Sequence, residues 1–322
     1  MYKEFSKMIN LLKEIKKLLS QIPKGKITTY KELAKALGDE NLFRFIARAL
    51  PLNDELQRYP CFKVIESDGS LGGYILGKKE KIKRLKKEGI EVKNEKVINF
   101  KKILFKEFKT DYPLKKLQKF QKELSKKIRI EKFHLKENLL AGAFDVSFQG
   151  REAFVCGLVM DDKFQVKEIH KEKTKVSFPY LPGYLCFREG PLIIKLFKKF
   201  KKKPDFLFLD GCGINHPRFL GLASFVGVML DFPTIGISKR NLCAKFFPPL
   251  KKGDFSYLYF KGKKVGIAFL AKEKTRPIFI SPGHKMEIQS AFILTKKFIL
   301  KSKLPEPLKL VDQLSKKFSK RL

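Results

Sequence analysis

The sequence predicts an α/β protein of two domains, in which a helix-turn-helix domain precedes a larger domain with a mixed β-sheet. A length of 322 residues suits two domains or three small ones, at about 100–200 residues per domain. The first part of the chain contains two short helical patterns around a turn with glycine, and the rest alternates apolar β-type runs with helical patterns. Hydrophobic residues make up 43% of the chain, which favours a folded protein over a disordered one.

The first domain begins with an amphipathic helix that extends to about Leu19. A second helix is expected over 31–37, because Gly38 follows its last apolar residue, and a third near 42–50. Two short helices around such a turn are typical of the helix-turn-helix motif. A lysine-dense stretch follows, and we place the boundary within it, which gives domains 1–100 and 101–322.

The second domain begins with a charged helix near 115–127. Three β-type runs then follow in quick succession, which predicts an antiparallel meander. Strands and helices alternate from there on, so that the sheet is expected to be mixed. The expected strands cover 141–148, 152–160, 162–169, 205–210, 233–238, 255–270 and 276–280, and the later helices cover 218–230, 286–300 and 309–319.

The charge of the chain indicates a polyanionic partner. Lysine and arginine number 70 against 33 acidic residues, so the formal net charge is +37, with +9 on residues 1–100 and +28 on residues 101–322. Such an excess is typical of proteins that bind nucleic acid. Lysine-rich chains also occur in hyperthermophiles, although there glutamate usually rises with lysine, which it does not here.

The cysteines and the hydropathy pattern predict a cytoplasmic protein with no membrane partner. The five cysteines are odd in number and have no CxxC spacing, which argues against a disulfide framework or a zinc site. The chain has no run of about 18 apolar residues, and its first residues form a lysine-interrupted helical pattern rather than a signal peptide.

Two aspartates at expected strand positions predict a metal site. Asp145 interrupts an apolar run, where an unpaired carboxylate would be unfavourable, and Asp210 ends the apolar run 205–209 just before Gly211. Sites in open α/β sheets form beyond the carboxyl ends of strands, and converging carboxylates suit Mg²⁺ or Mn²⁺. In a basic domain this combination favours phosphodiester hydrolysis. Either aspartate alone would be an ordinary salt-bridge or cap residue.

Several separated motifs resemble endonuclease V, a nuclease family that acts on deoxyinosine in DNA. The resemblance implies a ribonuclease-H-like fold, a Mg²⁺-dependent site, and cleavage of the second phosphodiester bond on the 3′ side of hypoxanthine, which leaves a 3′-hydroxyl and a 5′-phosphate. The resemblance covers about 124–314, and its motifs are 177–189, 210–224, 233–243, 281–285 and 304–310.

The resemblance also implies roles for individual residues. Asp145 and Asp210 would bind the metal, and Glu189 would complete the acidic cluster. His284 in the segment 281–285 would orient or deprotonate water, and Lys239 would lie near the scissile phosphate or the metal-bound water.

A loop at Tyr180 and Pro182 matches the segment that the family uses as a wedge. A rigid aromatic and proline tip can enter a base stack, and a weakly paired hypoxanthine is easier to extrude than a matched base. An ordinary surface turn with incidental aromatic residues is the alternative. One departure from the family is visible, because Phe225 stands where a histidine often follows Ala-Ser.

The segments 22–38, 44–54 and 59–77 are followed by a helical pattern that ends at Glu88. In this order they resemble the active domain of the O6-alkylguanine-DNA alkyltransferases, over about residues 20–90. The resemblance implies a winged-helix-like domain that flips an alkylated guanine and transfers its alkyl group to a cysteine. It would make Cys61 the acceptor, Tyr30 a contact to the flipped nucleotide's phosphate, Arg44 an intercalating residue, Asn53 a brace for the cysteine turn, Tyr74 a lining residue of the base pocket, and Glu88 the acidic partner.

The residue after the cysteine departs from that family. The family has Pro-Cys-His-Arg-Val, whereas this chain has Cys61-Phe62-Lys63, so an imidazole relay to Glu88 is absent from the sequence. A lone cysteine is more often a small core residue than a nucleophile, and only a small fraction of an unassisted thiol ionises at neutral pH. Two interpretations follow, namely transfer of the alkyl group to Cys61 or recognition of alkylated DNA without transfer.

The sequence as a whole predicts a DNA-repair protein in which an alkyltransferase-type domain precedes an endonuclease V domain. Its expected partner is DNA that contains deoxyinosine or O6-alkylguanine. A non-catalytic basic protein that binds nucleic acid is one alternative. Another is an inosine-specific ribonuclease with an inactive alkyltransferase-like lesion sensor, because hypoxanthine has the same base edges in RNA and in DNA.

Overall fold

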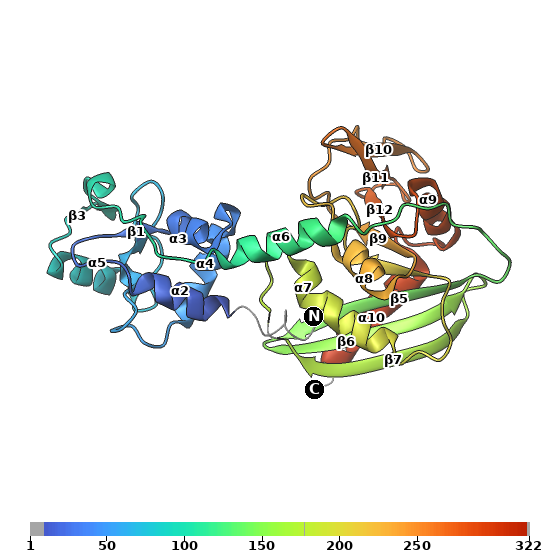
Figure 1. Ribbon diagram of the computed structural model, residues 1–322, viewed down its shortest axis with the longest axis horizontal. Coiled ribbons are helices and arrows are strands. Elements are labelled where there is room, and N and C mark those ends of the chain that lie inside the picture. Colours follow the sequence, from blue (N-terminus) through green and yellow to red (C-terminus); the bar gives the residue numbers. More distant parts are fainter. Residues whose placement is uncertain (1–9, 177, 321–322) are drawn as a thin grey trace. The chain divides into compact units, whose positions relative to one another are not determined.

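The computed structural model describes residues 10–176 and 178–320 and contains two compact units that divide between Lys119 and Phe120 (Figure 1). The expected boundary at 100/101 lies earlier in the chain. The difference arises because the segment after it is still bonded to the first unit: Ile27 accepts from Phe105 N at 2.7 Å and donates to Ile103 O at 3.1 Å. Each unit is described by itself below.

The N-terminal unit contains the expected helix-turn-helix. Thr29 caps α3 by accepting the Glu32 N–H at 3.1 Å, and Gly38 ends it with a φ of 103°, a left-handed conformation that glycine adopts without strain. Residues 1–9 of the expected first helix lie outside the described residues. The helices are α2 (Leu11–Leu19), α3 (Tyr30–Leu37), α4 (Phe43–Ala49) and α5 (Gly77–Lys87), the short 3₁₀ turns are η1 (Glu40–Leu42), η2 (Leu50–Leu52), η3 (Cys61–Lys63) and η4 (Phe100–Lys102), and the strands are β1 (Thr28–Thr29), β2 (Val64–Ile65), β3 (Val92–Lys93) and β4 (Lys96–Val97).

The C-terminal unit is built on an eight-stranded mixed sheet with the order β10-β11-β12-β9-β8-β5-β6-β7. The strands β5, β8 and β9 are parallel neighbours, whereas the other pairs are antiparallel. The predicted α/β class and the meander β5-β6-β7 are confirmed. The strands are β5 (Leu140–Gln149), β6 (Glu152–Asp161), β7 (Val166–Lys175), β8 (Phe206–Asp210), β9 (Thr234–Ser238), β10 (Phe255–Phe260), β11 (Lys263–Phe269) and β12 (Ile278–His284).

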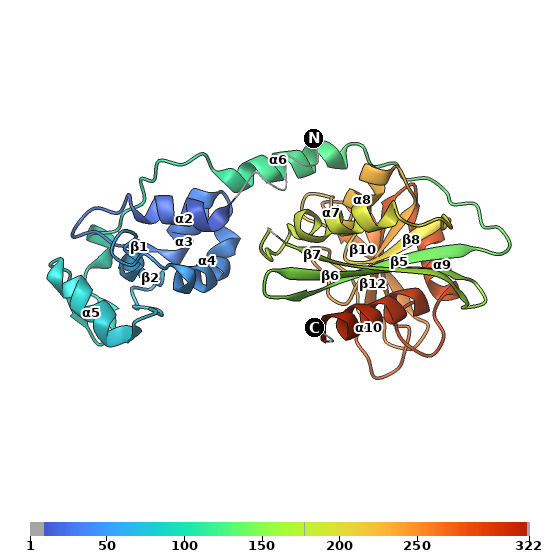
Figure 2. The same ribbon diagram turned by 90° about the horizontal axis from the view of Figure 1, so that it is seen from below.

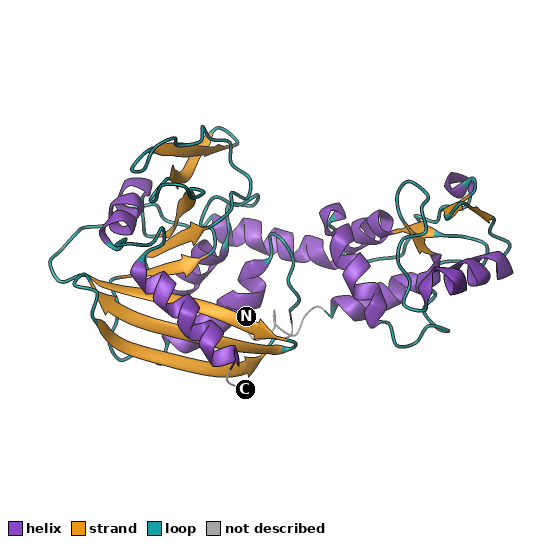
Figure 3. Ribbon diagram, turned by 180° about the vertical axis from the view of Figure 1, so that it is seen from behind, coloured by secondary structure: helices purple, strands orange, loops and turns teal. Residues whose placement is uncertain are grey.

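Helices cover both faces of this sheet. Figure 2 shows α7 (Leu185–Phe197) and α8 (Leu222–Leu230) on one face and α10 (Glu306–Lys320) on the other, where it shares a core with α9 (Ile288–Lys297). Seen from behind, α10 crosses the strands of the meander (Figure 3). The helix α6 (Pro113–Ser125) precedes the sheet in the chain. None of the helices within the described ranges is long and apolar enough to cross a membrane.

The helix α7 was not predicted, because Gly190 and Pro191 interrupt its pattern. Both residues disfavour a helix interior. A Cβ atom on Gly190 would lie only 2.6 Å from the ring of Phe225, so the glycine lets the two helices approach closely. Phe225 is buried and lies 6.1 Å from the Phe187 ring, which makes it a core residue of the α7–α8 interface.

Side-chain alternation on two strands positions the site. Ala141 and Ala143 on β5, and Phe208 on β8, point into the core under α10. Because alternate residues of a strand share a face, Asp145 and Asp210 continue these two series at the point where the core ends. The sheet therefore directs both carboxylates toward the side on which α10 packs.

A close approach of two chain segments fixes the end of β8. Gly213 lies so near Pro282 that a Cβ atom on it would be 2.0 Å from the Pro282 carbonyl oxygen. We expect Gly213→Ala to lower the free energy of unfolding by at least about 1–3 kcal/mol, the usual effect of overpacking, because only backbone movement can relieve the clash. Urea unfolding followed by circular dichroism measures this. Lys202→Ala, an exposed position in the same unit, is the control, and equal midpoints for both variants would contradict the close approach.

Candidate active site

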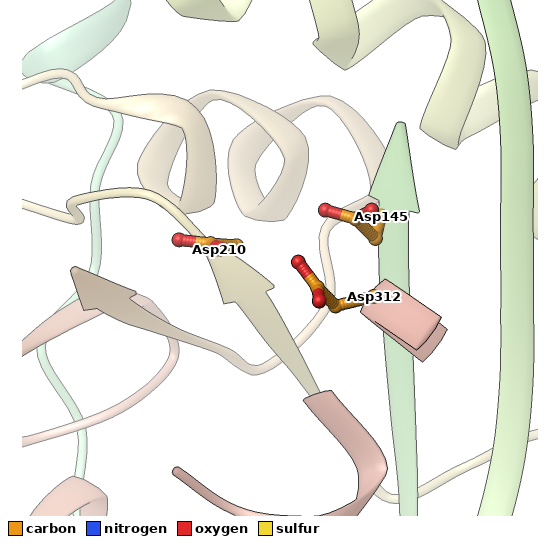
Figure 4. A group of neighbouring side chains, drawn as sticks. All are labelled: Asp145, Asp210 and Asp312. Atoms are coloured by element: carbon orange, nitrogen blue, oxygen red, sulfur yellow. The ribbon is translucent and has the colours of Figure 1, made fainter. Parts of the chain in front are cut away.

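Three carboxylates converge beside the carboxyl end of β8, where its pairing with β5 stops. Asp145 comes from β5, Asp210 from the last position of β8 and Asp312 from α10, and one oxygen of each lies within 4.8 Å of the others (Figure 4). The structure thus brings together the two aspartates predicted to bind a metal. Asp312 was missed by the sequence analysis, because an aspartate on a lysine-rich amphipathic helix looks like an ordinary solvated residue.

Neighbouring polar groups hold these carboxylates in place. The Ser315 hydroxyl, which lies close to Asp312 on α10, donates to Asp145 Oδ2, and Ser147 Oγ lies 2.7 Å from Ser315 Oγ. Lys239 Nζ lies 2.8 Å from Asp210 Oδ2 and 4.0 Å from Asp312 Oδ1. The predicted lysine is therefore part of the cluster.

The carboxylates share a region of concentrated negative charge. Burial raises the pKa of Asp145, and the charges of Asp210 and Asp312 raise it further. Burial also raises the pKa of Glu189 well above its ordinary value, and the charges of Asp145 and Asp210 add to the effect, so Glu189 lies within the field of the cluster. Burial opposes the charge on Lys239, but the three aspartates outweigh it and raise the pKa of Lys239.

The donor set fits a hard divalent cation. Three carboxylates supply only oxygen ligands at mutual distances that one ion can bridge, and Mg²⁺ and Mn²⁺ prefer such ligands. The only cation that an ion pair places against Asp210 or Asp312 from outside α10 is Lys239, among the residues that the structure describes. The cluster could therefore hold a metal ion, whose charge would offset the repulsion between the aspartates.

A cavity of about 290 Å³ adjoins the cluster. The predicted wedge loop, with Tyr180 and Pro182, forms one wall, and Asp210 and Lys239 belong to another. Tyr180 is 56% exposed, so its ring is available to an incoming ligand. Ser177, at the start of the motif 177–189, lies outside the described residues.

The wedge loop is anchored at its base through one carbonyl. Gly183 O accepts hydrogen bonds from His216 Nε2 at 3.0 Å, Gln121 Nε2 at 3.2 Å and Arg218 Nη2 at 2.5 Å. Burial, followed by the charge of Arg218, lowers the pKa of His216 to about 3, so its imidazole is neutral and donates through Nε2–H. These three residues were not singled out by the sequence analysis, because their partner is a backbone atom.

His284 lies nearer the other end of the strands than the carboxylates do. It pairs with Thr234 at the start of β9, whereas Asp210 pairs with Ile237 near the end of that strand. The physical reason is that β12 is antiparallel to β9, so a motif at the carboxyl end of β12 reaches the edge where β8 and β9 begin.

Both ring nitrogens of His284 also have other partners. Nδ1 accepts the backbone N–H of Arg129 at 3.2 Å, and Nε2 hydrogen-bonds Asp231 at 3.0 Å. The ring is buried. In this arrangement the imidazole connects the end of α8 to the sheet, and a role of His284 in water activation stays a prediction.

In the N-terminal unit, Cys61 is buried at the start of η3. Asn53 Nδ2 lies 3.5 Å from Cys61 Sγ and donates to Tyr59 O at 2.9 Å. Burial raises the pKa of the Cys61 thiol, and the Asn53 hydrogen bond only partly offsets it. The thiol form is therefore favoured at neutral pH.

Glu88 forms an ion pair with Lys63. Its carboxylate forms a 2.7 Å ion pair with the buried Lys63 and accepts the Gly25 N–H at 3.0 Å. Phe62 is buried in the core of this unit. The acid that would polarise an imidazole in the related family thus stabilises a lysine here.

The remaining predicted contacts of this unit have mixed exposure. Arg44 is exposed on α4, in keeping with a contact to DNA. Tyr30 is buried, which raises its pKa to about 12, and its hydroxyl lies 3.4 Å from Gly73 O. The buried Tyr74 hydroxyl has no hydrogen-bond partner among the described residues, so a ligand could supply one.

Comparisons with known proteins match each of the two parts of the chain to a family. A family model described as endonuclease V matches residues 122–313, and one described as the DNA binding domain of 6-O-methylguanine DNA methyltransferase matches residues 10–90. A bifunctional methyltransferase/endonuclease of Picrophilus torridus is 36% identical over 303 residues, which are 94% of this chain and 94% of the relative.

Solved structures resemble the C-terminal unit. Endonuclease V from Streptomyces avermitilis superimposes with a TM-score of 0.61 at 27% identity, covering 64% of this chain and 93% of that one. Endonuclease V from Ciona intestinalis, in complex with a 24mer DNA that contains an inosine followed by a ribo-adenosine, gives a TM-score of 0.58 at 28% identity, covering 66% and 99%.

Measurements of metal binding and of stability can distinguish the roles of Asp312 and His284. We expect Asp312→Asn to weaken Mn²⁺ binding by about tenfold or more in isothermal titration calorimetry, because a charged ligand is lost. His284→Asn should leave Mn²⁺ affinity unchanged while lowering the free energy of unfolding by about 1–3 kcal/mol, because buried hydrogen bonds are broken. The opposite pattern would show that the histidine, and not the aspartate, belongs to the metal site.

Proposed function

The chain belongs to the endonuclease V family, in the form that also carries an alkyltransferase-like domain, and from this premise we propose that its C-terminal domain cleaves DNA beside deoxyinosine with Mg²⁺. It is a DNA-repair endonuclease. The single observation that carries the proposal is that the carboxylate cluster and the wedge loop lie beside one cavity. Cleavage at the second phosphodiester bond 3′ to the lesion is the position that the family resemblance implies.

Asp145, Asp210 and Asp312 would hold Mg²⁺, and Mn²⁺ fits the same oxygen ligands. When bound, such an ion lowers the pKa of water and stabilises the charge that develops on the phosphate and the departing 3′-oxygen. Lys239 adds a positive charge at the same edge, where it would contact the scissile phosphate. Glu189 supplies a carboxylate that would orient the attacking water or a second ion.

Tyr180 and Pro182 would separate the lesion from its neighbour and direct it into the cavity. A purine base fits within about 290 Å³, and the anchored Gly183 carbonyl keeps the loop in place. Hypoxanthine pairs weakly, so its extrusion requires less free energy than that of a matched base. An endonuclease V that is 28% identical to this chain has been crystallised in complex with inosine-containing DNA, which supports such DNA as the substrate class.

We propose DNA rather than RNA as the substrate and the cytoplasm as the location. The attached N-terminal domain matches a family of DNA-binding domains. When two domains of one chain bind the same DNA, the binding of one raises the effective concentration of the other at that DNA. The five cysteines are all free thiols, as a reducing compartment requires.

For the N-terminal domain we propose recognition of O6-alkylguanine with little transfer to Cys61. Arg44 would enter the stack, Tyr30 would contact the backbone of the flipped nucleotide and Tyr74 would line the base pocket. Cys61 is buried in its thiol form, and Glu88 is held by Lys63. Without an imidazole next to the cysteine, the sulfur is hydrogen-bonded by the Asn53 amide, a group that cannot remove the thiol proton.

The nuclease proposal predicts that Asp145→Ala and Asp210→Ala each abolish Mg²⁺-dependent nicking of a deoxyinosine duplex while most DNA affinity remains, because the lysines supply that affinity. Gel analysis of a labelled strand measures nicking, and Glu152→Gln, in an exposed ion pair with Lys173, is the control. Matched RNA and DNA strands compare the two substrates. Full nicking by both aspartate variants would contradict the assigned site, and a protein that binds with steep salt dependence but never yields product would be the non-catalytic alternative.

The recognition proposal predicts that the unaltered protein binds O6-methylguanine DNA more tightly than undamaged DNA, yet acquires little radiolabelled methyl group. The double variant Phe62→His, Lys63→Arg restores the family's motif and places an imidazole next to Cys61, so its labelling rate should rise by about a hundredfold, the lower end of what general bases usually provide. Cys61→Ser in that background should remove the label. Rapid stoichiometric labelling of the unaltered protein would show instead that Cys61 is an efficient acceptor.

A further inference from the structure

We propose that the loop 245–254, termed the Phe247 loop, is a second DNA contact of the nuclease domain, beyond the wedge loop and the metal site. The inference rests on the proposed function. Phe247 is 87% exposed and Leu250 is 85% exposed, more than any of the other exposed large apolar side chains within the described residues. Both lie among the exposed lysines Lys245, Lys251 and Lys252.

The Phe247 loop is held in a defined conformation. Lys245 and Tyr259 exchange backbone hydrogen bonds of 2.8 and 2.9 Å, and the Ser256 hydroxyl donates to Phe247 O at 2.5 Å. On the return, Gly253 N donates to Leu270 O at 2.9 Å. Two prolines between Phe247 and Leu250 restrict the backbone further. An apolar tip that is fixed in solvent has already lost the conformational entropy that binding would otherwise remove.

The register of the sheet places the Phe247 loop at the same edge as the carboxylates. Asp210 pairs with Ile237 on β9, and the next residue of β9, Ser238, pairs with Phe279 on β12. The adjoining Ile278 pairs with Phe269 on β11, which in turn pairs with Phe255, the residue that follows the Phe247 loop. The loop and the metal site therefore lie at the same end of the strands.

The separation along this edge suits one duplex. Four steps between neighbouring strands lead from β8 to β10, and at about 4.8 Å per step they span roughly 19 Å. At about 3.4 Å per nucleotide this distance corresponds to five or six nucleotides. A duplex seated on the carboxylates would thus reach the Phe247 loop within one helical turn.

The chemistry of the loop favours DNA as its occupant. Its one acidic residue, Asp254, accepts the Lys251 N–H within the loop, so three lysines face outward with a positive charge. Phenylalanine and leucine side chains insert between base steps or stack on bases in many architectural proteins, while lysines contact phosphates. An apolar protein partner would not need this density of lysine around the tip.

The test combines a loop variant with duplexes of different arm length. Phe247→Ala with Leu250→Ala removes the apolar tip at exposed positions, and Leu300→Ala, at a position that is 56% exposed, is the matched control. Fluorescence anisotropy in Ca²⁺ gives the Kd for a deoxyinosine duplex with 12-base-pair arms, and for duplexes in which one arm or the other is cut to four.

We expect the tip variant to raise the Kd at least fivefold on long arms and to equal the unaltered protein when the arm on the loop's side is short. An unchanged Kd on long arms, or a loss that is the same for every arm length, would overturn the proposal. A shift in mass in analytical ultracentrifugation between the two proteins would also overturn it, because the tip would then join copies of the chain. Nicking in Mg²⁺ is measured separately. The comparison of Kd values in Ca²⁺ can therefore be interpreted even if the protein does not nick DNA.

Discussion

Repulsion between partly buried carboxylates is the constraint around which the site of the C-terminal domain is organised. Asp145, Asp210 and Asp312 come from three different elements, and their charges oppose one another at a partly buried site. Such an arrangement is unfavourable without a cation, so the fold must supply the free energy that holds it. The sheet does so through the hydrophobic core under α10, which fixes both the strands and the helix that carry the acids.

The first two acids could be predicted from the sequence, because alternation along a strand and a position at a strand end are local properties. Asp312 could not, because its meeting with Asp145 depends on where α10 packs across the sheet. The position of His284 could not be predicted for a related reason, since a motif near a strand end does not indicate which end of the sheet that strand end reaches. The helix α7 was hidden by Gly190 and Pro191, which are tolerated only because a neighbouring helix packs against them.

The N-terminal domain shows a different limit. Sequence alone located Cys61 and the missing imidazole, but it left the state of Glu88 open. The ion pair with Lys63 connects both departures from the family's motif, because the lysine that replaces the family's arginine also occupies the acid. The proposal that Cys61 accepts little alkyl group therefore depends on two neighbouring positions, Phe62 and Lys63.

The three donors on the Gly183 carbonyl have a consequence for selectivity. As the proposed wedge, a loop fixed at its base would rearrange little when DNA arrives, so most of the conformational change would take place in the nucleic acid. Discrimination then depends on how strongly each base is held by its partner and its neighbours, in addition to the shape of the cavity. Under the proposed function such a loop would respond to local duplex stability, and any weakly held purine would compete for the site in proportion to its tendency to open.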